Sequence, residues 1–204
     1  MFAFPVDDEV QKAVQHAINT LEYMGADIRE VSWPMLDKAI AITNAIKMPE
    51  VTSYYGNLVK NHGSQIFEPV RMRLESGFFI SACDYIQAQR ARILFIKSSI
   101  EMMEEIDVIL SPTTPVTAFK MDTDDSHDWE TGGVTRNAVA FLTQYTVPFN
   151  LNGFPAISLI CGFSEEGLPI GLQIAGKHLE EEKVLQIAYA YEQAAGLCNI
   201  RPFE

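Results

Sequence analysis

Positive charge is scarce in this 204-residue sequence, which has 15 lysine and arginine residues against 27 aspartate and glutamate residues. Nucleic-acid binding draws its affinity from clustered Lys and Arg side chains that displace counterions from the phosphate backbone. A chain with a formal net charge of −12 and no basic cluster lacks that source of affinity. We therefore expect no nucleic-acid partner.

Cysteine is also scarce: Cys83, Cys161 and Cys198 lie far apart, and no two form a Cys-x-x-Cys pair. This spacing predicts neither a disulfide framework nor a zinc site, and it is typical of a chain kept in a reducing compartment. No apolar run reaches the roughly 18 residues of a membrane-spanning helix, and the N-terminus has no basic segment followed by an apolar one. We expect a cytoplasmic protein without a membrane partner.

Several motifs that carry a known mechanism are missing, among them Gly-x-Gly-x-x-Gly, the Gly-Lys-Ser/Thr phosphate loop, Gly-x-Ser-x-Gly and His-Glu-x-x-His. Their absence excludes whole reaction classes. His127 lies among the acidic residues of the segment 122–130, which suggests a metal site, but a solvated acidic loop is the preferred interpretation. We predict no metal and no cofactor.

Three short apolar runs, at residues 108–110, 156–163 and 170–175, are bounded by Pro and Gly and predict buried strands. The last two are joined by Ser164-Glu-Glu-Gly167, which predicts a β-hairpin. The first follows a long helical pattern almost at once, as strands of α/β sheets do. The sequence therefore predicts an α/β fold, with a mixed β-sheet covered by helices, in a single domain spanning residues 1–204.

Apolar residues spaced three and four apart predict helices over most of the remaining chain. Ser81 with Asp84 resembles a capping box and should begin the longest helix. The segment 50–62 has no clean period and is interpreted as a broken helix or a loop. The other expected elements are helices at 10–25, 36–46 (interrupted by Pro49), 69–77, 136–145 (ended by Pro148) and 180–196, and a short strand at 27–33.

Two side chains suggest chemistry, and each has a structural alternative. Ser111 ends a buried strand, but no His or Lys is locally placed to act as its base, so strand-end capping is favoured over a nucleophile. Arg73 precedes Gly77 by one helical turn and is suited to a bidentate clamp on a carboxylate or carbonyl. A surface or helix-packing arginine is the alternative interpretation.

Three blocks of sequence resemble the carboxyl-terminal half of the amidase signature family. They are Asp107-Val-Ile-Leu-Ser-Pro-Thr-Thr-Pro115, Thr146-Val-Pro-Phe-Asn-Leu-Asn-Gly-Phe-Pro-Ala-Ile-Ser158 and Gly167-Leu-Pro-Ile-Gly-Leu-Gln-Ile-Ala-Gly176, in the family's order. Arg73-Leu-Glu-Ser-Gly77 is similar to the helical region that precedes them. The resemblance covers essentially the whole chain and implies a partial amidase-signature fold.

The resemblance implies a family that hydrolyses or transfers carboxylic amides with a Ser, cis-Ser, Lys triad. Those residues belong to a Gly- and Ser-rich region of the amino-terminal half, and this sequence contains no such region. No catalytic residue is therefore carried over. We expect the carboxyl-terminal portion of an amidase, inactive alone, that takes an amide substrate when an amino-terminal half completes it.

On the substrate side, the resemblance implies that Arg73 binds one end of the substrate. In relatives that use glutamine an Asp is expected where this chain has Thr143, which favours an apolar or neutral substrate. Thr113, Thr114, Asn150 and Gly153 are expected to shape the pocket. The alternatives are a non-catalytic binding or structural module that self-associates as a homo-oligomer, and an amidotransferase subunit.

Overall fold

The computed structural model describes residues 3–119, 128–131, 134–197 and 200, and between residues 128 and 139 it describes the backbone alone. Contacts divide the chain into two compact units, one formed by Met1–Trp33 with Ile100–Glu204 and the other by Pro34–Ser99. The expectation of one domain over residues 1–204 stays a prediction. No helix among the described residues is long and apolar enough to cross a membrane.

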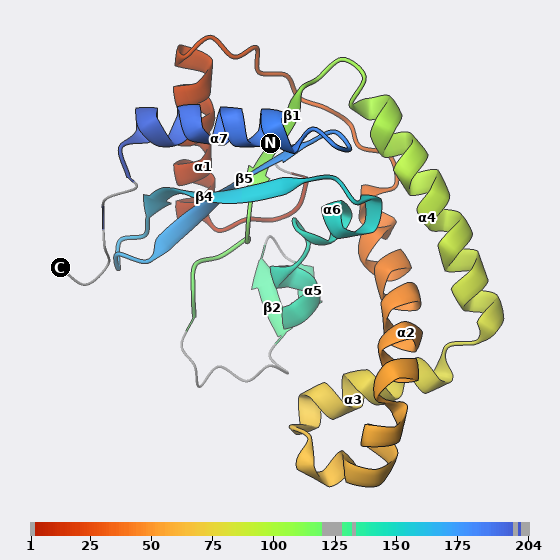
Figure 1. The fold of residues 1–204 in the computed structure, drawn as a ribbon. Helices are drawn as coiled ribbons and strands as arrows, with labels where there is room; N and C mark the ends of the chain where they lie inside the picture. The colour runs from red at the N-terminus through yellow and green to blue at the C-terminus, as the bar shows by residue number, and fades with distance from the viewer. Residues whose placement is uncertain (1–2, 120–127, 132–133, 198–199, 201–204) are drawn as a thin grey trace. The chain divides into compact units, whose positions relative to one another are not determined.

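The first unit contains a three-stranded sheet built from β1 (Val108–Pro112), β4 (Ala156–Phe163) and β5 (Pro169–Gly176), in the order β1-β5-β4. The α/β class and the β4–β5 hairpin are confirmed (Figure 1). The mixed sheet needs a correction, because both pairings are antiparallel. β1 and β4 do run in the same direction, but β5 lies between them and prevents a parallel pair.

Helices α1 (Asp8–Tyr23) and α7 (Glu181–Ala195) cover one face of this sheet, as predicted (Figure 1). The Asp7 side chain caps α1 by accepting a hydrogen bond from the Glu9 backbone N–H at 3.1 Å. At the end of α7, Gly196 adopts a φ of 66°, a left-handed conformation that glycine tolerates without steric cost. The core between helices and sheet consists of Val10, Val14, Ala17, Leu21, Cys161, Ile170, Leu172, Ile174, Ala188 and Tyr191.

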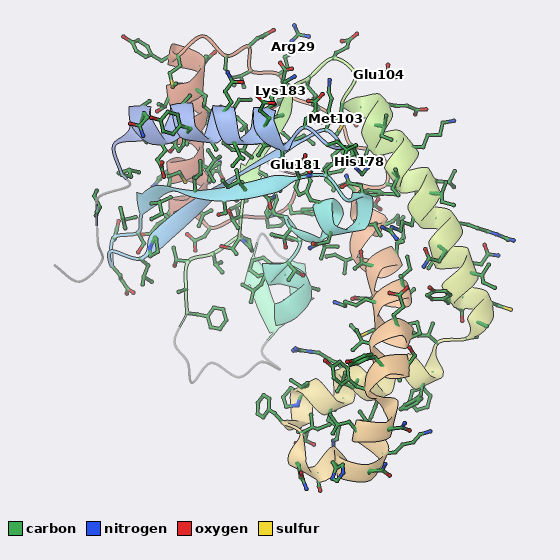
Figure 2. The ribbon with its side chains drawn as sticks, in the orientation of Figure 1. Arg29, Met103, Glu104, His178, Glu181 and Lys183 are labelled. Atoms are coloured by element: carbon green, nitrogen blue, oxygen red, sulfur yellow. The ribbon has the colours of Figure 1, made fainter. Side chains whose placement is uncertain are left out.

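An exposed ion pair joins the start of α7 to the residue that precedes β1. The Lys183 ammonium, labelled in Figure 2, donates to the Asp107 carboxylate at 2.9 Å. This hydrogen bond, with the attraction of the positive charge, lowers the pKa of Asp107. Because both side chains face solvent, the pair orients the two elements more than it stabilises them.

Among the described residues of the first unit, the opposite face of the sheet is only partly covered. Phe149, Phe154 and Met103 form a second buried cluster with Ala175 of β5. Phe149 belongs to α6 (Val147–Asn152), a helix that begins with Pro148 in its first turn. Further along this face, the β4 residues Ala156, Ser158 and Ile160 are exposed.

Three expectations for the first unit were wrong. Residues 27–33 form no strand, because their imperfect alternation meets no neighbouring strand among the described residues. The helix expected at 136–145 is replaced by β3 (Val134–Asn137), which pairs with β2 (Asp128–Thr131), and by the short α5 (Ala138–Leu142). Pro148 starts α6 instead of ending that helix, because its fixed φ suits a first helical turn. His127 and the acids at 122–125 lie outside the described residues.

The second unit is helical and contains α2 (Ala39–His62), α3 (Glu68–Ser76) and most of α4 (Ala82–Met102). The capping box that begins α4 is confirmed, because the Asp84 N–H donates to the Ser81 hydroxyl at 3.1 Å and the hydroxyl donates to the Asp84 carboxylate at 2.7 Å. The helix break at Pro49 is wrong, since α2 continues through it to His62.

Packing explains why α3 ends in glycine. A Cβ on Gly77 would collide with the Met48 carbonyl and with the Thr52 hydroxyl of α2. That hydroxyl already donates to the Leu74 carbonyl. The glycine therefore lets α2 and the end of α3 approach closely, and this contact brings Arg73 next to α2.

We predict an alkaline loss of stability from the core of the first unit. Burial raises the pKa of the Cys161 thiol from 9.0 to about 12, and it raises the pKa of Tyr191 from 10.0 to about 12. The folded state keeps both protons, so their stabilising contribution is complete below pH 9 and is lost as pH rises toward 12. Cys161 alone should contribute a loss of about 1 kcal/mol between pH 8 and pH 10.

Urea unfolding at pH 8 and pH 10 measures this loss. Cys161→Ala should flatten the pH dependence of the unfolding free energy, whatever its effect at pH 8. The matched control is Cys83→Ala, since Cys83 is an exposed thiol. Equal pH slopes for the wild type and Cys161→Ala would contradict the prediction.

Candidate functional site

The six residues expected to bind substrate or shape its pocket are divided between the two units. Arg73 belongs to α3 of the second unit. The other five belong to the first unit, where they follow β1 or lie in and around α6; they are Thr113, Thr114, Thr143, Asn150 and Gly153. Their roles toward a substrate stay predictions.

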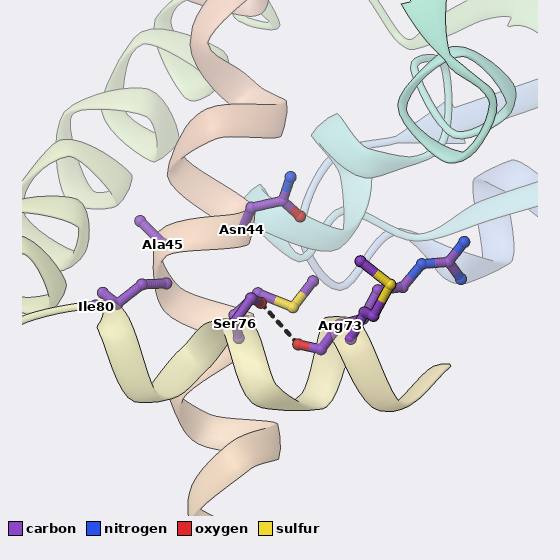
Figure 3. A pocket seen from close by; sticks show the side chains of 7 residues that line it. Asn44, Ala45, Arg73, Ser76 and Ile80 are labelled. Atoms are coloured by element: carbon purple, nitrogen blue, oxygen red, sulfur yellow. Dashed lines mark hydrogen bonds between the residues drawn. The ribbon is translucent and has the colours of Figure 1, made fainter. Parts of the chain in front are cut away.

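Arg73 lines a surface pocket of about 510 Å³ between α2 and α3 (Figure 3). Most of the lining residues are apolar, and the polar ones are Asn44, Arg73 and Ser76. Arg73 is half-buried, and its guanidinium makes no ion pair or hydrogen bond among the described residues. The lining consists of Asn44, Ala45, Met48, Met72, Arg73, Ser76 and Ile80.

Local geometry orients the polar lining of this pocket. The Ser76 hydroxyl donates to the Arg73 carbonyl at 2.7 Å, which fixes the last turn of α3 (Figure 3). Pro49 has no N–H to donate to the Ala45 carbonyl four residues earlier, so α2 lacks one helical hydrogen bond where it borders the pocket. A planar guanidinium beside apolar walls is suited to a ligand with a carbonyl or carboxylate end and an apolar body.

Thr113 and Thr114 form a tight turn after β1. The Thr113 N–H donates to the Gly171 carbonyl at 2.9 Å, and its hydroxyl pairs with the Ser158 hydroxyl of β4 at 2.6 Å. The Thr114 hydroxyl donates to the Val116 carbonyl at 2.9 Å. Thr113 therefore ties the end of β1 across the sheet, whereas Thr114 bonds within its own segment.

Thr143 and Asn150 each bond to backbone groups at the start of α6. The Thr143 carbonyl accepts from Val147 N–H at 2.9 Å and from the N–H of Thr146 at 3.1 Å. The Asn150 amide donates to the Thr146 carbonyl at 3.2 Å. Gly153 then ends α6 with a φ of 78°, a conformation that favours glycine. The structure thus brings Thr143, Asn150 and Gly153 to the two ends of one short helix.

A buried polar network connects β5 with β1 and with the turn before α6. Sequence reasoning did not predict it. The Gln173 amide of β5 donates to the Ser111 hydroxyl at 3.0 Å and to the Tyr145 carbonyl at 2.9 Å. Gln173 is 4% exposed, so both hydrogen bonds are shielded from water. The signal was present in the sequence, since Gln173 is the lone polar residue in the apolar run 170–175.

The described residues contain no base for a nucleophile at Ser111 and no group of three or more His, Cys, Asp or Glu side chains that could hold a metal ion. The Ser111 hydroxyl accepts a hydrogen bond from an amide nitrogen, which cannot take its proton. The hydrogen bond joins Ser111 of β1 to Gln173 of β5.

The chain belongs to the amidase family, because residues 1–185 match the family model described as Amidase. It is 36% identical over 189 residues to an amidase of Pseudomonas putida, a match that covers 93% of this chain and 40% of the relative. It is 37% identical over 222 residues to a glutamyl-tRNA(Gln) amidotransferase subunit of Brevibacillus brevis, with 97% and 44% covered.

The likeness extends to three dimensions. The chain superposes on the crystal structure of an amidase with a TM-score of 0.84 and 26% identity, over 93% of this chain and 42% of that one. The amidase-signature fold is thus confirmed. The chain spans less than half the length of the relatives that it matches.

We predict that the Gln173 network stabilises the first unit. Gln173→Glu replaces the donating amide with a carboxylate, which cannot donate to the Tyr145 carbonyl. The substitution should lower the free energy of unfolding by about 1–3 kcal/mol at pH 7, and part of this loss should be recovered at acid pH, where the carboxyl is protonated. The control Gln15→Glu lies on the exposed surface of α1 and should change stability by less than about 0.5 kcal/mol. Equal effects of the two substitutions in urea unfolding would refute the prediction.

Proposed function

We propose that this chain is the carboxyl-terminal portion of an amide-hydrolysing amidase of the Ser, cis-Ser, Lys type, that it is inactive alone, and that an amino-terminal half completes it. The observation that carries this proposal is coverage: nearly the whole chain matches family members, yet it spans 40% of the Pseudomonas putida amidase. The Gly- and Ser-rich region that would hold the triad has no counterpart in this sequence.

The substrate that we propose is a carboxylic amide with an apolar or neutral body. Arg73 would bind its carbonyl or carboxylate end, while Met48, Met72 and Ile80 would contact the apolar part. Thr143 supports this choice, because its side chain offers no negative charge to a substrate ammonium group. For the first unit by itself we propose pocket-shaping roles, in which Thr113, Thr114, Asn150 and Gly153 would hold the end of β1 and the helix α6.

Two secondary inferences, on cellular location and on oligomeric state, accompany this proposal. The wide spacing of the cysteines supports a reducing, cytoplasmic location. Self-association as a homo-oligomer is the second candidate, and exposed aromatic side chains of the second unit favour it: Tyr54 is 80% exposed, Phe67 68% and Phe79 88%.

The role of amidotransferase subunit has weaker support, because Thr143 replaces the Asp expected in relatives that use glutamine.

We predict that activity appears only on reconstitution. A serine-directed fluorophosphonate should not label the isolated chain, because the hydroxyls of Ser111 and Ser158 bond to an amide and to a threonine hydroxyl and not to a His or Lys base. Mixing the chain with a separately expressed amino-terminal half should produce labelling of that half and hydrolysis of a neutral aryl amide. Each polypeptide alone is the control. Labelling of the isolated chain would disprove the claim that it lacks a nucleophile.

In the reconstituted enzyme, Arg73→Ala should raise KM for an amide with a carboxylate end by about tenfold or more, because a charge-assisted hydrogen bond is lost. Arg73→Lys should recover only part of that affinity, since it lacks the planar fork. Arg71→Ala is the matched control: Arg71 lies on the same helix but contacts Glu68 and Glu75. Steady-state kinetics in which both alanine variants raise KM equally would contradict the role of Arg73.

A further inference from the structure

We propose that Met72 is a reversible oxidation site, and that its conversion to the sulfoxide weakens the pocket beside Arg73 for ligands with an apolar body. This inference rests on the proposed function, because it concerns the pocket that the proposed function assigns to the substrate. Met72 and Arg73 are neighbours on α3, and both line the pocket of about 510 Å³ (Figure 3). A thioether and a guanidinium therefore border the same space.

Met72 is the most accessible methionine among the described residues. It is 61% exposed, whereas Met24 is 45% exposed and Met103 is 1% exposed. Met48, the other methionine of the pocket, is half-buried. Because an oxidant has to reach the sulfur atom, Met72 should react before the other methionine of the pocket.

The proposed step uses hydrogen peroxide as the oxidant. A lone pair of the Met72 sulfur attacks one peroxide oxygen, a sulfur–oxygen bond forms, and the O–O bond breaks. The sulfur loses two electrons, and the second peroxide oxygen leaves as water with both protons. Methionine sulfoxide reductases return the sulfoxide to the thioether, so the modification is reversible.

The sulfoxide changes the pocket in two ways. It places a polar group on a lining in which Ala45, Met48 and Ile80 are apolar, so the apolar part of a ligand loses a favourable contact. Its oxygen also accepts hydrogen bonds, and it lies in the same pocket as the Arg73 guanidinium, which only donates them. The sulfoxide therefore competes with the carbonyl or carboxylate end of the ligand.

Oxidation of Met72 should leave the second unit folded. No residue of α3 is buried. The contacts that hold α3 against α2 are the hydrogen bond from the Thr52 hydroxyl to the Leu74 carbonyl and the close approach at Gly77, and neither involves Met72. An effect of oxidation on the pocket can therefore be separated from an effect on stability.

The test measures binding of 4-phenylbutyrate, a probe with a carboxylate end and an apolar body, to the whole chain. Carbon-13 labels on the methionine methyl groups report the oxidation of each methionine by NMR, and the same signals follow the titration. Cys83→Ala is present throughout, because Cys83 is an exposed thiol that peroxide would also attack. Limited peroxide treatment should oxidise Met72 before Met103 and weaken probe binding by about threefold or more. Treatment with methionine sulfoxide reductase should restore the affinity.

Two leucine substitutions distinguish the pocket methionine from an exposed methionine elsewhere. Met72→Leu keeps the volume and the apolar surface but cannot be oxidised, so peroxide should not change its affinity for the probe. Met24→Leu is the matched control: Met24 lies at the end of α1, and the variant should lose affinity on peroxide treatment as the unsubstituted chain does. Arg73→Ala should weaken probe binding before any oxidation.

The outcomes separate the oxidation site from the proposed function. Probe binding that depends on Arg73 but does not change when Met72 is oxidised would overturn the oxidation site and leave the proposed function intact. An equal loss of affinity in Met72→Leu, or a Met72 thioether that survives while Met103 is oxidised, would do the same. Absence of Arg73-dependent probe binding would overturn both the oxidation site and the proposed role of Arg73.

Discussion

The central strand β5 is the constraint on which the first unit depends. It pairs with β1 on one side and β4 on the other, and Ile174 and Ala175 on its two faces are completely buried. A strand buried on both faces has to be almost continuously apolar. Its single buried polar side chain, Gln173, satisfies its amide by bonding to Ser111 of β1 and to Tyr145 in the turn before α6. The strand thereby positions both loops that carry the expected pocket residues.

The two faces of the sheet differ in how fully the chain covers them. α1 and α7 bury one face with aliphatic side chains, whereas Phe149, Phe154 and Met103 cover only one end of the other. Ile160 is an apolar side chain exposed to water on β4, a terminal strand of this sheet. Such exposure is unfavourable unless another surface covers it. This asymmetry agrees with a chain that spans less than half the length of its relatives.

Periodicity in the sequence predicted the elements whose neighbours are local. The α1 stripe, the β4–β5 hairpin and the capping box of α4 each depend on residues a few positions apart, so pattern alone identified them. The order β1-β5-β4 depends on a contact between Val108 and Gly176, which are far apart in sequence, and no local pattern encodes it. Pro49 shows the same limit, because tertiary packing against Gly77 keeps α2 helical where propensity predicts a break.

Apart from Arg73, the expected site residues came from family resemblance, and physical reasoning could not have selected them. Thr143 and Asn150 are ordinary turn and helix residues by composition, and Arg73 was ambiguous until the structure placed it in a pocket without an ionic partner among the described residues. Gln173, by contrast, was accessible to physical reasoning, since a lone amide in a buried strand requires partners. The resemblance supplied the expected pocket residues, while burial explains what holds the segments that carry them.

Three hydroxyl groups of the first unit bond to groups that do not activate a nucleophile. A serine becomes a nucleophile only when a base accepts its proton. Ser111 accepts a hydrogen bond from the Gln173 amide, which is a donor, and Thr113 and Ser158 pair with each other. All three hydroxyls thus join strands, and none of them bonds to a basic side chain among the described residues. Under the proposed function, the reacting serine would come from the amino-terminal half.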